Sequence, residues 1–322
     1  MVYRLRGALI AAVSFMLGSL AYAQNYPERP IRFIVPFAPG GTNDIVARLS
    51  GAKLAEKLGQ QVVIDNRGGA NGAIGTEMAA RSLPDGYTLL MANLNFAINP
   101  ALMSKLPYEP LADFAPISLL ATSPTVLVVH PSLAVTNVQE LIAHVKANPG
   151  KLNYSSSGVG TSTHVPMELL ISMTGMKMEP VHYKGGGPAL VDLLAGRVPV
   201  GFTTILSVQQ HLKANRLRAI AVSSTRRSAS LPNAPTIAES GVPGYEFVGW
   251  WGVVAPAKTP AAIINRLNAE FVKIQREPFM AEHLSQEGAE PRTNSPQEFG
   301  QFLRNETAKW TKVARDNNLK AE

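Results

Sequence analysis

The 322-residue sequence contains no cysteine, which excludes disulfide bonds, thiol chemistry and a lipid-modified cysteine. Charged residues make up only 16% of the chain and hydrophobic residues 46%, a balance that allows a large core and two domains. The formal net charge is +7, but no run of lysine and arginine with interleaved aromatic residues occurs. These patterns argue against nucleic acid as a partner and are compatible with a small anionic ligand.

The motifs of common enzymes are also missing. The sequence has neither the metal-binding motif H-E-x-x-H nor the phosphate-binding loop G-x-x-x-x-G-K-[ST]. Gly158-Val159-Gly160 begins a dinucleotide-binding fingerprint, but Thr163 stands where its third glycine is needed. The six histidines show no spacing typical of metal ligands. We therefore expect no enzymatic activity, no cofactor and no metal ion.

The chain begins with the features of an export signal. Arg4 and Arg6 give it a positive start, residues 8–20 form an apolar core, and Ala21-Tyr22-Ala23 fits an A-x-A cleavage site. The apolar core is short for a bilayer span, so an uncleaved anchor is the less favoured alternative. The sequence predicts that residues 1–23 are a signal peptide, cleaved after Ala23, and that the mature chain is secreted.

A buried strand and a glycine turn open the mature chain. Residues 31–35 form an apolar run typical of a strand covered on both faces, and Pro36 and Pro39 follow it. Gly40-Gly41 then leads into residues 42–44, which favour the start of a helix. Such a turn offers free backbone N–H groups and the positive end of a helix dipole, which suits a carboxylate. The alternative is an ordinary strand-to-helix connection.

Strands and helices alternate along the chain. The expected strands are 31–35, 61–65, 87–92, 125–129, 152–155, 179–183, 198–203, 217–223 and 245–254. The expected helices are one from 42 onward, 74–82, 138–147, 163–174, 188–195 and a helical tail over 260–319. This alternation predicts parallel βαβ units, with ligands bound beyond the carboxyl ends of the strands. Residues 98–118 are rich in proline and are expected to be an irregular connection.

The order of these elements predicts two domains that the chain connects twice. Residues 24–123 are expected to form the first part of domain I and residues 124–225 domain II. Residues 226–322 are then a return strand and C-terminal helices that complete domain I. Two crossings make a hinge, and the cleft between the domains is the expected ligand site.

Four turns that follow expected strands are rich in glycine or small polar residues, so we expect them to meet at this cleft. They are Gly40-Gly41-Thr42, Asn93-Leu94-Asn95, residues 155–158 and Tyr183-Lys184-Gly185. Each hydroxyl or N–H group there can stabilise a carboxylate by a net ~1.5–3 kcal/mol, because the hydrogen bond is charge-assisted. The alternative for some of them is a plain turn.

Several long motifs resemble the Bug (TctC-like) family, the substrate-binding proteins of tripartite tricarboxylate transporters. They are PIRFIVPFAPGG (30–41), DNRGGANGAIG (65–75), PDGYTL (84–89), NPGKLNYSSSGVG (148–160), YKGG (183–186), LRAIAV (217–222) and LPNAPTIAESG (231–241). The resemblance covers essentially the whole mature chain in order. It implies a type II periplasmic binding protein of the Venus flytrap kind, an α/β fold with mainly parallel sheets flanked by helices and two interdomain crossings.

The resemblance also implies a function. Such a receptor captures a small organic carboxylate in the periplasm without chemistry and passes it to the membrane subunits of the transporter. A monomer is expected, since the receptor must open and close. The candidate ligand-binding residues are Phe37, Ala38, Gly40, Gly41, Thr42, Asp44, Asn93, Asn95, Ser155, Ser157, Thr161, His164, Tyr183 and Thr203.

Two alternatives stay open at this point. The chain could be a ligand-sensing partner of a sensor kinase with transport lost, because no motif marks the docking surface. Co-purification with a kinase ectodomain would separate the two roles. A remote alternative is a secreted serine hydrolase that uses Ser157 or Ser162 with His164, although no acid that would orient the histidine is evident.

The sequence departs from the family pattern at two positions. His182 stands where many members have proline, and Thr203 stands where many have aspartate. The loss of that carboxylate argues against an ammonium-bearing ligand and suits a hydroxyl, an amide or a second carboxylate. We predict that Thr203→Asp weakens binding of a dicarboxylate in a titration of the mature protein, because it adds a like charge. Unchanged affinity would count against this role.

Overall fold

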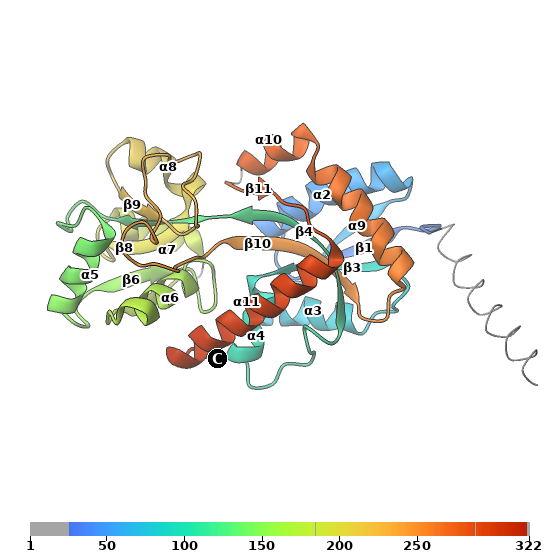
Figure 1. Cartoon of the computed structure of the whole chain (residues 1–322), viewed down its shortest axis with the longest axis horizontal. Coiled ribbons are helices and arrows are strands. Elements are labelled where there is room, and N and C mark those ends of the chain that lie inside the picture. The colour runs from blue at the N-terminus through green and yellow to red at the C-terminus, as the bar shows by residue number, and fades with distance from the viewer. Residues whose placement is uncertain (1–25, 184, 287, 321–322) are drawn as a thin grey trace, which may run out of the picture.

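The computed structural model describes residues 26–183, 185–286 and 288–320, and two mixed β-sheets organise it (Figure 1). The first sheet has the order β11-β4-β10-β3-β1-β2. Its strands are β1 (Ile31–Val35), β2 (Val62–Asn66), β3 (Thr88–Asn93), β4 (Phe114–Ser123), β10 (Gly249–Pro256) and β11 (Glu290–Pro291). Strands β1, β2 and β3 pair in parallel, whereas β10 pairs antiparallel with β3 and β4.

Helices cover both faces of this sheet. They are α2 (Thr42–Leu58), η1 (Ala70–Gly72), α3 (Ala73–Ala80), α4 (Leu94–Leu102), α9 (Ala261–Gln275), α10 (Pro278–Gln286) and α11 (Pro296–Asp316). Strand β1 is buried on both faces, with Phe33 and Ile34 fully inaccessible, as its unbroken apolar run predicts. The core of this domain therefore lies between the sheet and its two helical layers.

The second sheet has the order β7-β6-β8-β5-β9. Its strands are β5 (Thr125–Val129), β6 (Asn153–Ser156), β7 (Glu179–His182), β8 (Val200–Thr204) and β9 (Arg218–Val222). Its helices are α5 (Val138–Ala147), α6 (Val165–Thr174), α7 (Gly186–Leu194) and α8 (Ile205–Lys213). Strands β6, β7 and β8 run in parallel, and β5 pairs antiparallel with β8 and β9. The predicted two-domain α/β fold is confirmed, and both sheets are mixed.

One segment was predicted wrongly. Residues 98–118 are not an irregular connection, because they contain most of α4 and the first half of β4. The side chain of Asn93 caps α4 by accepting the Asn95 N–H group, and tertiary burial stabilises the helix although it contains Pro100. Pro116 is tolerated in β4 because the pairing register with β10 shifts beside it. Helix α8 was not predicted.

The first domain crossing is a single residue, Pro124, between β4 and β5. The first crossing is held against the end of β9, since the Thr125 N–H group donates to Ser223 Oγ and the Ser223 N–H group donates to the Thr125 carbonyl, both at 2.9 Å. After β9 the chain stays on the second sheet, where the Ile237 N–H group bonds the Val222 carbonyl. We propose that the second crossing lies near Phe247, later than the expected boundary at 225/226.

Helix α11 forms a further, non-covalent link between the domains. It starts with a capping box made by Ser295 and Glu298, and it packs on α4 through its apolar face, which includes the buried Trp310. Its C-terminal end reaches α6 of the second domain, where Asn317 Nδ2 donates to the Glu168 carbonyl at 3.1 Å. Figure 1 shows this helix running from the first domain toward the second.

None of the helices in the described ranges is long and apolar enough to cross a membrane. The expected signal peptide, residues 1–23, lies outside the described residues.

We predict that Gly252→Ala destabilises the fold by about 1–3 kcal/mol, since overpacking strains a dense core. A methyl group at Gly252 in β10 would come within 2.2 Å of the Phe299 ring from α11. Urea unfolding followed by circular dichroism measures the change. The control is Gly186→Ala in α7, where no atom lies within 4 Å and no loss of stability is expected. Equal stability of both variants would contradict this packing argument.

Candidate functional site

The carboxyl ends of the parallel strands in the two sheets face one another. Strand β3 runs opposite to β10, which leaves the hinge, and β8 runs opposite to β5, which also leaves it. Strands β1 and β3 therefore end toward the second domain, and β6 and β8 end toward the first. The turn after β6 reaches the first domain, because a methyl group at Gly160 would lie within 2.6 Å of Leu102 Cδ1 at the end of α4 and 3.5 Å from Asn71 Nδ2.

In the first domain, the predicted glycine turn is exposed and ends at the start of α2. Gly41 is the N-cap residue of α2. Within the described residues no side chain caps this helix, so its first N–H groups, including that of Thr42, have no side-chain partner. Phe37 and Ala38 form the other side of this turn and lie against the second glycine-rich loop at Gly68. A helix start of this kind is suited to bind an anion.

The side chain of Asp44 holds this turn in its conformation through hydrogen bonds. Its Oδ2 atom accepts hydrogen bonds from the Gly40 N–H group at 2.9 Å and from Arg48 Nε at 2.8 Å, and Oδ1 accepts one from Asn66 Nδ2 at 3.0 Å. Only 3% of Asp44 is exposed. Burial alone would raise the pKa of this carboxyl group, but the three hydrogen bonds outweigh burial and hold the pKa below its usual range. Asp44 thus positions the donors and is itself turned away from the surface.

A chain of five asparagines joins the elements beneath the turn. Asn93 Nδ2 donates to Asn43 Oδ1 at 2.9 Å, and Asn95 Nδ2 donates to Asn71 Oδ1 at 2.6 Å. Asn71 and Asn99 bond one another through side chain and backbone. The predicted Asn93 and Asn95 are therefore central to this network, and sequence reasoning missed the other three. The Asn-Gly pair at Asn71 was the available signal, because Asn71 has a positive φ of 54°.

In the second domain, three hydroxyl groups form a cluster at the turn after β6. Ser157 Oγ lies 3.1 Å from Thr161 Oγ1 and 2.7 Å from Thr163 Oγ1. Thr161 Oγ1 donates to the Gly158 carbonyl at 2.7 Å, and the Ser157 N–H group donates to Thr163 Oγ1. These three residues are only partly buried. The hydroxyl cluster can rotate its hydrogens toward a ligand oxygen, and Thr163 is a member that the sequence did not predict.

The remaining predicted residues of the second domain have structural partners. Ser155 is buried between β6 and β8, where its Oγ would lie 2.2 Å from a methyl group at Gly201. The Tyr183 hydroxyl donates to Asp192 Oδ2 at 2.8 Å, and burial followed by this carboxylate raises the pKa of Tyr183 to about 12. Thr203 Oγ1 lies 2.8 Å from Ser207 Oγ at the start of α8.

His164 supports the hydroxyl cluster from inside the domain. It is 1% exposed, its Nδ1 atom accepts the Gly160 N–H group at 3.1 Å, and its ring stacks on Tyr154. Burial, with a smaller effect of His182, lowers the pKa of His164 to about 3, so the ring is neutral. Within the described residues, no serine hydroxyl bonds this ring, so the geometry gives no support to the hydrolase alternative.

The site consists of hydrogen-bond donors, namely backbone N–H groups and hydroxyl groups. Across residues 26–183, 185–286 and 288–320, no group of three His, Asp or Glu side chains is placed to hold a metal ion. Two α/β domains, a double crossing and facing turns of N–H and hydroxyl donors place the chain among the solute-binding receptors of the Venus flytrap type.

Comparison with known proteins gives the particular family. The chain matches the model of the TctC family, the tripartite tricarboxylate transporter family receptors, over residues 46–319. It belongs to this family, whose members are periplasmic solute-binding receptors and not enzymes.

Three solved structures are similar over nearly the whole chain. "R. palustris Rpa4515 with adipate" is 38% identical with a TM-score of 0.79, covering 92% of this chain and 99% of that one. The periplasmic binding protein BugD is 32% identical with a TM-score of 0.76, covering 92% and 100%. MatC (Rpa3494) from Rhodopseudomonas palustris with bound malate is 30% identical with a TM-score of 0.76, covering 89% and 99%.

We predict that Asp44→Asn lowers the free energy of unfolding by about 1–3 kcal/mol at pH 7, because buried donors lose their charged partner. The folded pKa of Asp44 lies below its unfolded value, so its contribution is complete above about pH 4 and is lost as the pH falls through the folded pKa. The difference from wild type should therefore shrink in acid. Urea unfolding at several pH values measures it.

The matched control is Glu56→Gln, which removes one partner of an exposed ion pair with Lys53. This variant should change stability by no more than about 0.5 kcal/mol. If the difference in the free energy of unfolding between Asp44→Asn and wild type grows as the pH falls, the predicted direction of the pH dependence is wrong.

Proposed function

We propose that this chain is a periplasmic receptor that captures a small organic carboxylate between its two domains. The observation that carries the proposal is the pair of facing donor groups, namely the uncapped start of α2 after Gly41 and the hydroxyl cluster of Ser157, Thr161 and Thr163. A carboxylate at either place gains charge-assisted hydrogen bonds worth ~1.5–3 kcal/mol each. The positive end of the α2 dipole adds to the attraction for an anion.

The preferred ligand class is a dicarboxylate. Two separate donor groups suit a molecule with a negative group at each end, and relatives in the same family are described with adipate and with malate. Thr203, at the end of β8, adds a hydroxyl and no charge to this side of the cleft. We propose that Gly41 and Thr42 bind one carboxylate through backbone N–H groups, while the Gly40 N–H group stays bonded to Asp44, and that the hydroxyl cluster binds the other carboxylate.

Asp44, His164 and the asparagine network then act as positioning residues. Asp44 holds the Gly40 N–H group in place, and His164 holds the Gly160 N–H group at the edge of the hydroxyl cluster. Neutral asparagines fix the helix starts without adding negative charge that would repel an anion. The separation into ligand-binding donors and buried positioning residues explains why only part of the predicted set of ligand residues is exposed at the boundary.

The physiological setting follows from the family. We propose that a signal peptide cleaved after Ala23 directs the chain to the periplasm, where it works as a monomer. Ligand-loaded receptor would then deliver its cargo to membrane subunits of a tripartite transporter. The family model and the similarity to periplasmic binding proteins support this role over that of a sensor kinase partner.

We predict that the double variant Ser157→Ala with Thr163→Val weakens binding of adipate or malate by about tenfold or more, since at least one charge-assisted hydrogen bond is lost. Isothermal titration calorimetry of the mature protein measures the affinity. The matched control is Ser162→Ala, in the same turn but outside the hydroxyl cluster, which should keep wild-type affinity.

Unchanged affinity of the double variant would contradict the role of the hydroxyl cluster. Native mass spectrometry of the purified protein identifies any carboxylate that is already bound, and a sample without bound ligand that responds to no organic acid would overturn the proposed function. Ester turnover that disappears in Ser162→Ala would instead favour the hydrolase alternative.

A further inference from the structure

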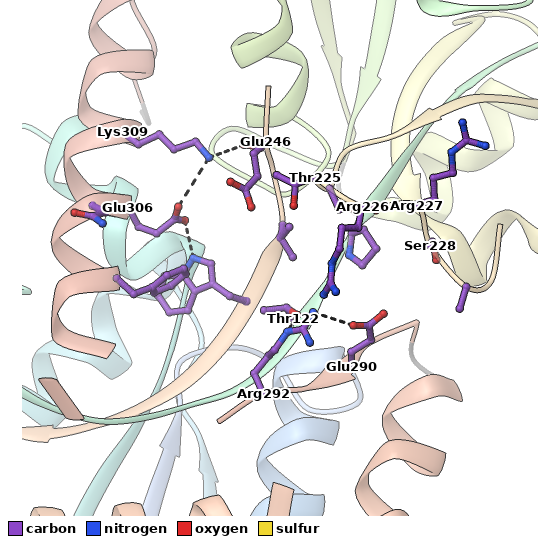
Figure 2. Close-up of a pocket in the computed structure, with 17 residues that line it drawn as sticks. Thr122, Thr225, Arg226, Arg227, Ser228, Glu246, Glu290, Arg292, Glu306 and Lys309 are labelled. Carbon is purple, nitrogen blue, oxygen red and sulfur yellow. Dashed lines mark hydrogen bonds and ion pairs between the residues drawn. The ribbon is translucent and has the colours of Figure 1, made fainter. Parts of the chain in front are cut away.

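A cavity of about 830 Å³ lies at the hinge and is lined by both chain crossings and by α11 (Figure 2). Thr122 and Pro124 line it from the first crossing, residues 224–229 from the segment after β9, and Arg292 from the segment after β11. We call it the hinge cavity. Strands β11 and β9 are edge strands, whereas the ligand turns follow β1, β3 and β6. The hinge cavity is therefore separate from the proposed carboxylate site, and none of the predicted ligand residues lines it.

Two guanidinium groups extend into the hinge cavity from different domains. Arg226 follows β9 of the second sheet, and Arg292 follows β11 of the first. Figure 2 shows both side chains directed toward Thr122. Arg292 Nε donates to Thr122 Oγ1 at 2.9 Å, and its Nη2 atom pairs with Glu290 at 2.8 Å. In the part of the chain that the structure describes, no hydrogen bond or ion pair engages the Arg226 guanidinium group.

The other acidic residues of the hinge cavity do not neutralise Arg226. Glu306 Oε2 accepts the indole N–H groups of Trp250 and Trp310, each at 2.8 Å. Lys309 Nζ donates to the Glu246 backbone carbonyl at 2.5 Å, and among the described residues the Glu246 carboxylate makes no ion pair with Arg226 (Figure 2). The Arg226 end of the hinge cavity thus carries two positive charges and one carboxylate, that of Glu290. Like charges that converge in a partly enclosed space attract a counter-ion.

We propose that the hinge cavity binds one small oxyanion, a carboxylate or a phosphate group, between Arg226 and Arg292. Guanidinium groups suit such oxygens because they present several N–H donors in one plane. Thr122 Oγ1 accepts from Arg292 and keeps its own hydrogen as a third donor. The volume lies within the roughly 300–1,000 Å³ range of small-molecule sites.

A bound oxyanion would link the two domains at the hinge. One anchoring arginine moves with each sheet, so opening of the ligand cleft changes their separation. An anion that binds only one domain arrangement changes the affinity of the cleft for its carboxylate, and the cleft ligand changes the affinity for the anion by the same factor. The hinge cavity is in this way a regulatory site for ligand capture.

The test uses inorganic phosphate and, in a second arm, succinate, each titrated calorimetrically into the full mature chain at low ionic strength. Both titrations are made in the Ser157→Ala with Thr163→Val background, which weakens the carboxylate site. One anion per chain is expected to bind, and Arg226→Gln and Arg292→Gln should each weaken it at least about tenfold. The titration that gives the lower dissociation constant, with phosphate or with succinate, identifies the preferred anionic group.

The matched control is Arg227→Gln. Arg227 neighbours Arg226 and lines the same cavity, but its guanidinium group pairs with Glu239 at 3.0 Å. It should keep the affinity of the unsubstituted chain. Arg226 is exposed, so Arg226→Gln should fold normally even if Arg292→Gln does not. The proposal is overturned if neither anion binds, if Arg226→Gln binds as tightly as its parent, or if Arg227→Gln weakens binding equally.

Discussion

The double crossing between the sheets is the constraint on which the rest of the structure depends. Strand β4 passes into β5 through Pro124 alone, and Thr125 at the start of β5 pairs with Ser223 at the end of β9. This pairing fixes the direction of each crossing strand. Antiparallel pairing then makes β3 and β8 run toward the boundary, so the turns after them face one another. The position of the proposed ligand site is thus a consequence of strand direction at the hinge.

The electrostatics of the cleft explain why the protein binds an anion without chemistry. The proposed donors are backbone N–H groups at the start of α2 and hydroxyl groups after β6, and neither kind transfers a proton readily near neutral pH. The ionisable groups nearby are not available for acid–base catalysis. Asp44 accepts hydrogen bonds from three donors, and His164 is buried and neutral. A site of this kind lowers the energy of a bound carboxylate and leaves its covalent bonds unchanged.

Much of this architecture could be predicted from local patterns. The apolar run at residues 31–35 and the β-branched run at residues 125–129 became strands at the predicted positions, because burial on both faces leaves a signal in the sequence. Helix α4 could not be predicted, since distant packing overrides the effect of Pro100. The sequence placed Asp44 and His164 beside the turns, but it could not show that both side chains are buried, because that depends on residues distant in the sequence.

The carboxylate of Glu306 has a consequence for spectroscopy. It joins the indole groups of Trp250, on the strand that leaves the hinge, and Trp310, on the helix that reaches the second domain. Two of the three tryptophans of the chain therefore share one charged neighbour. Indole emission depends on the local electric field, so a shift of α11 relative to β10 changes the emission wavelength of the protein. Its natural fluorescence therefore reports how α11 packs within the first domain.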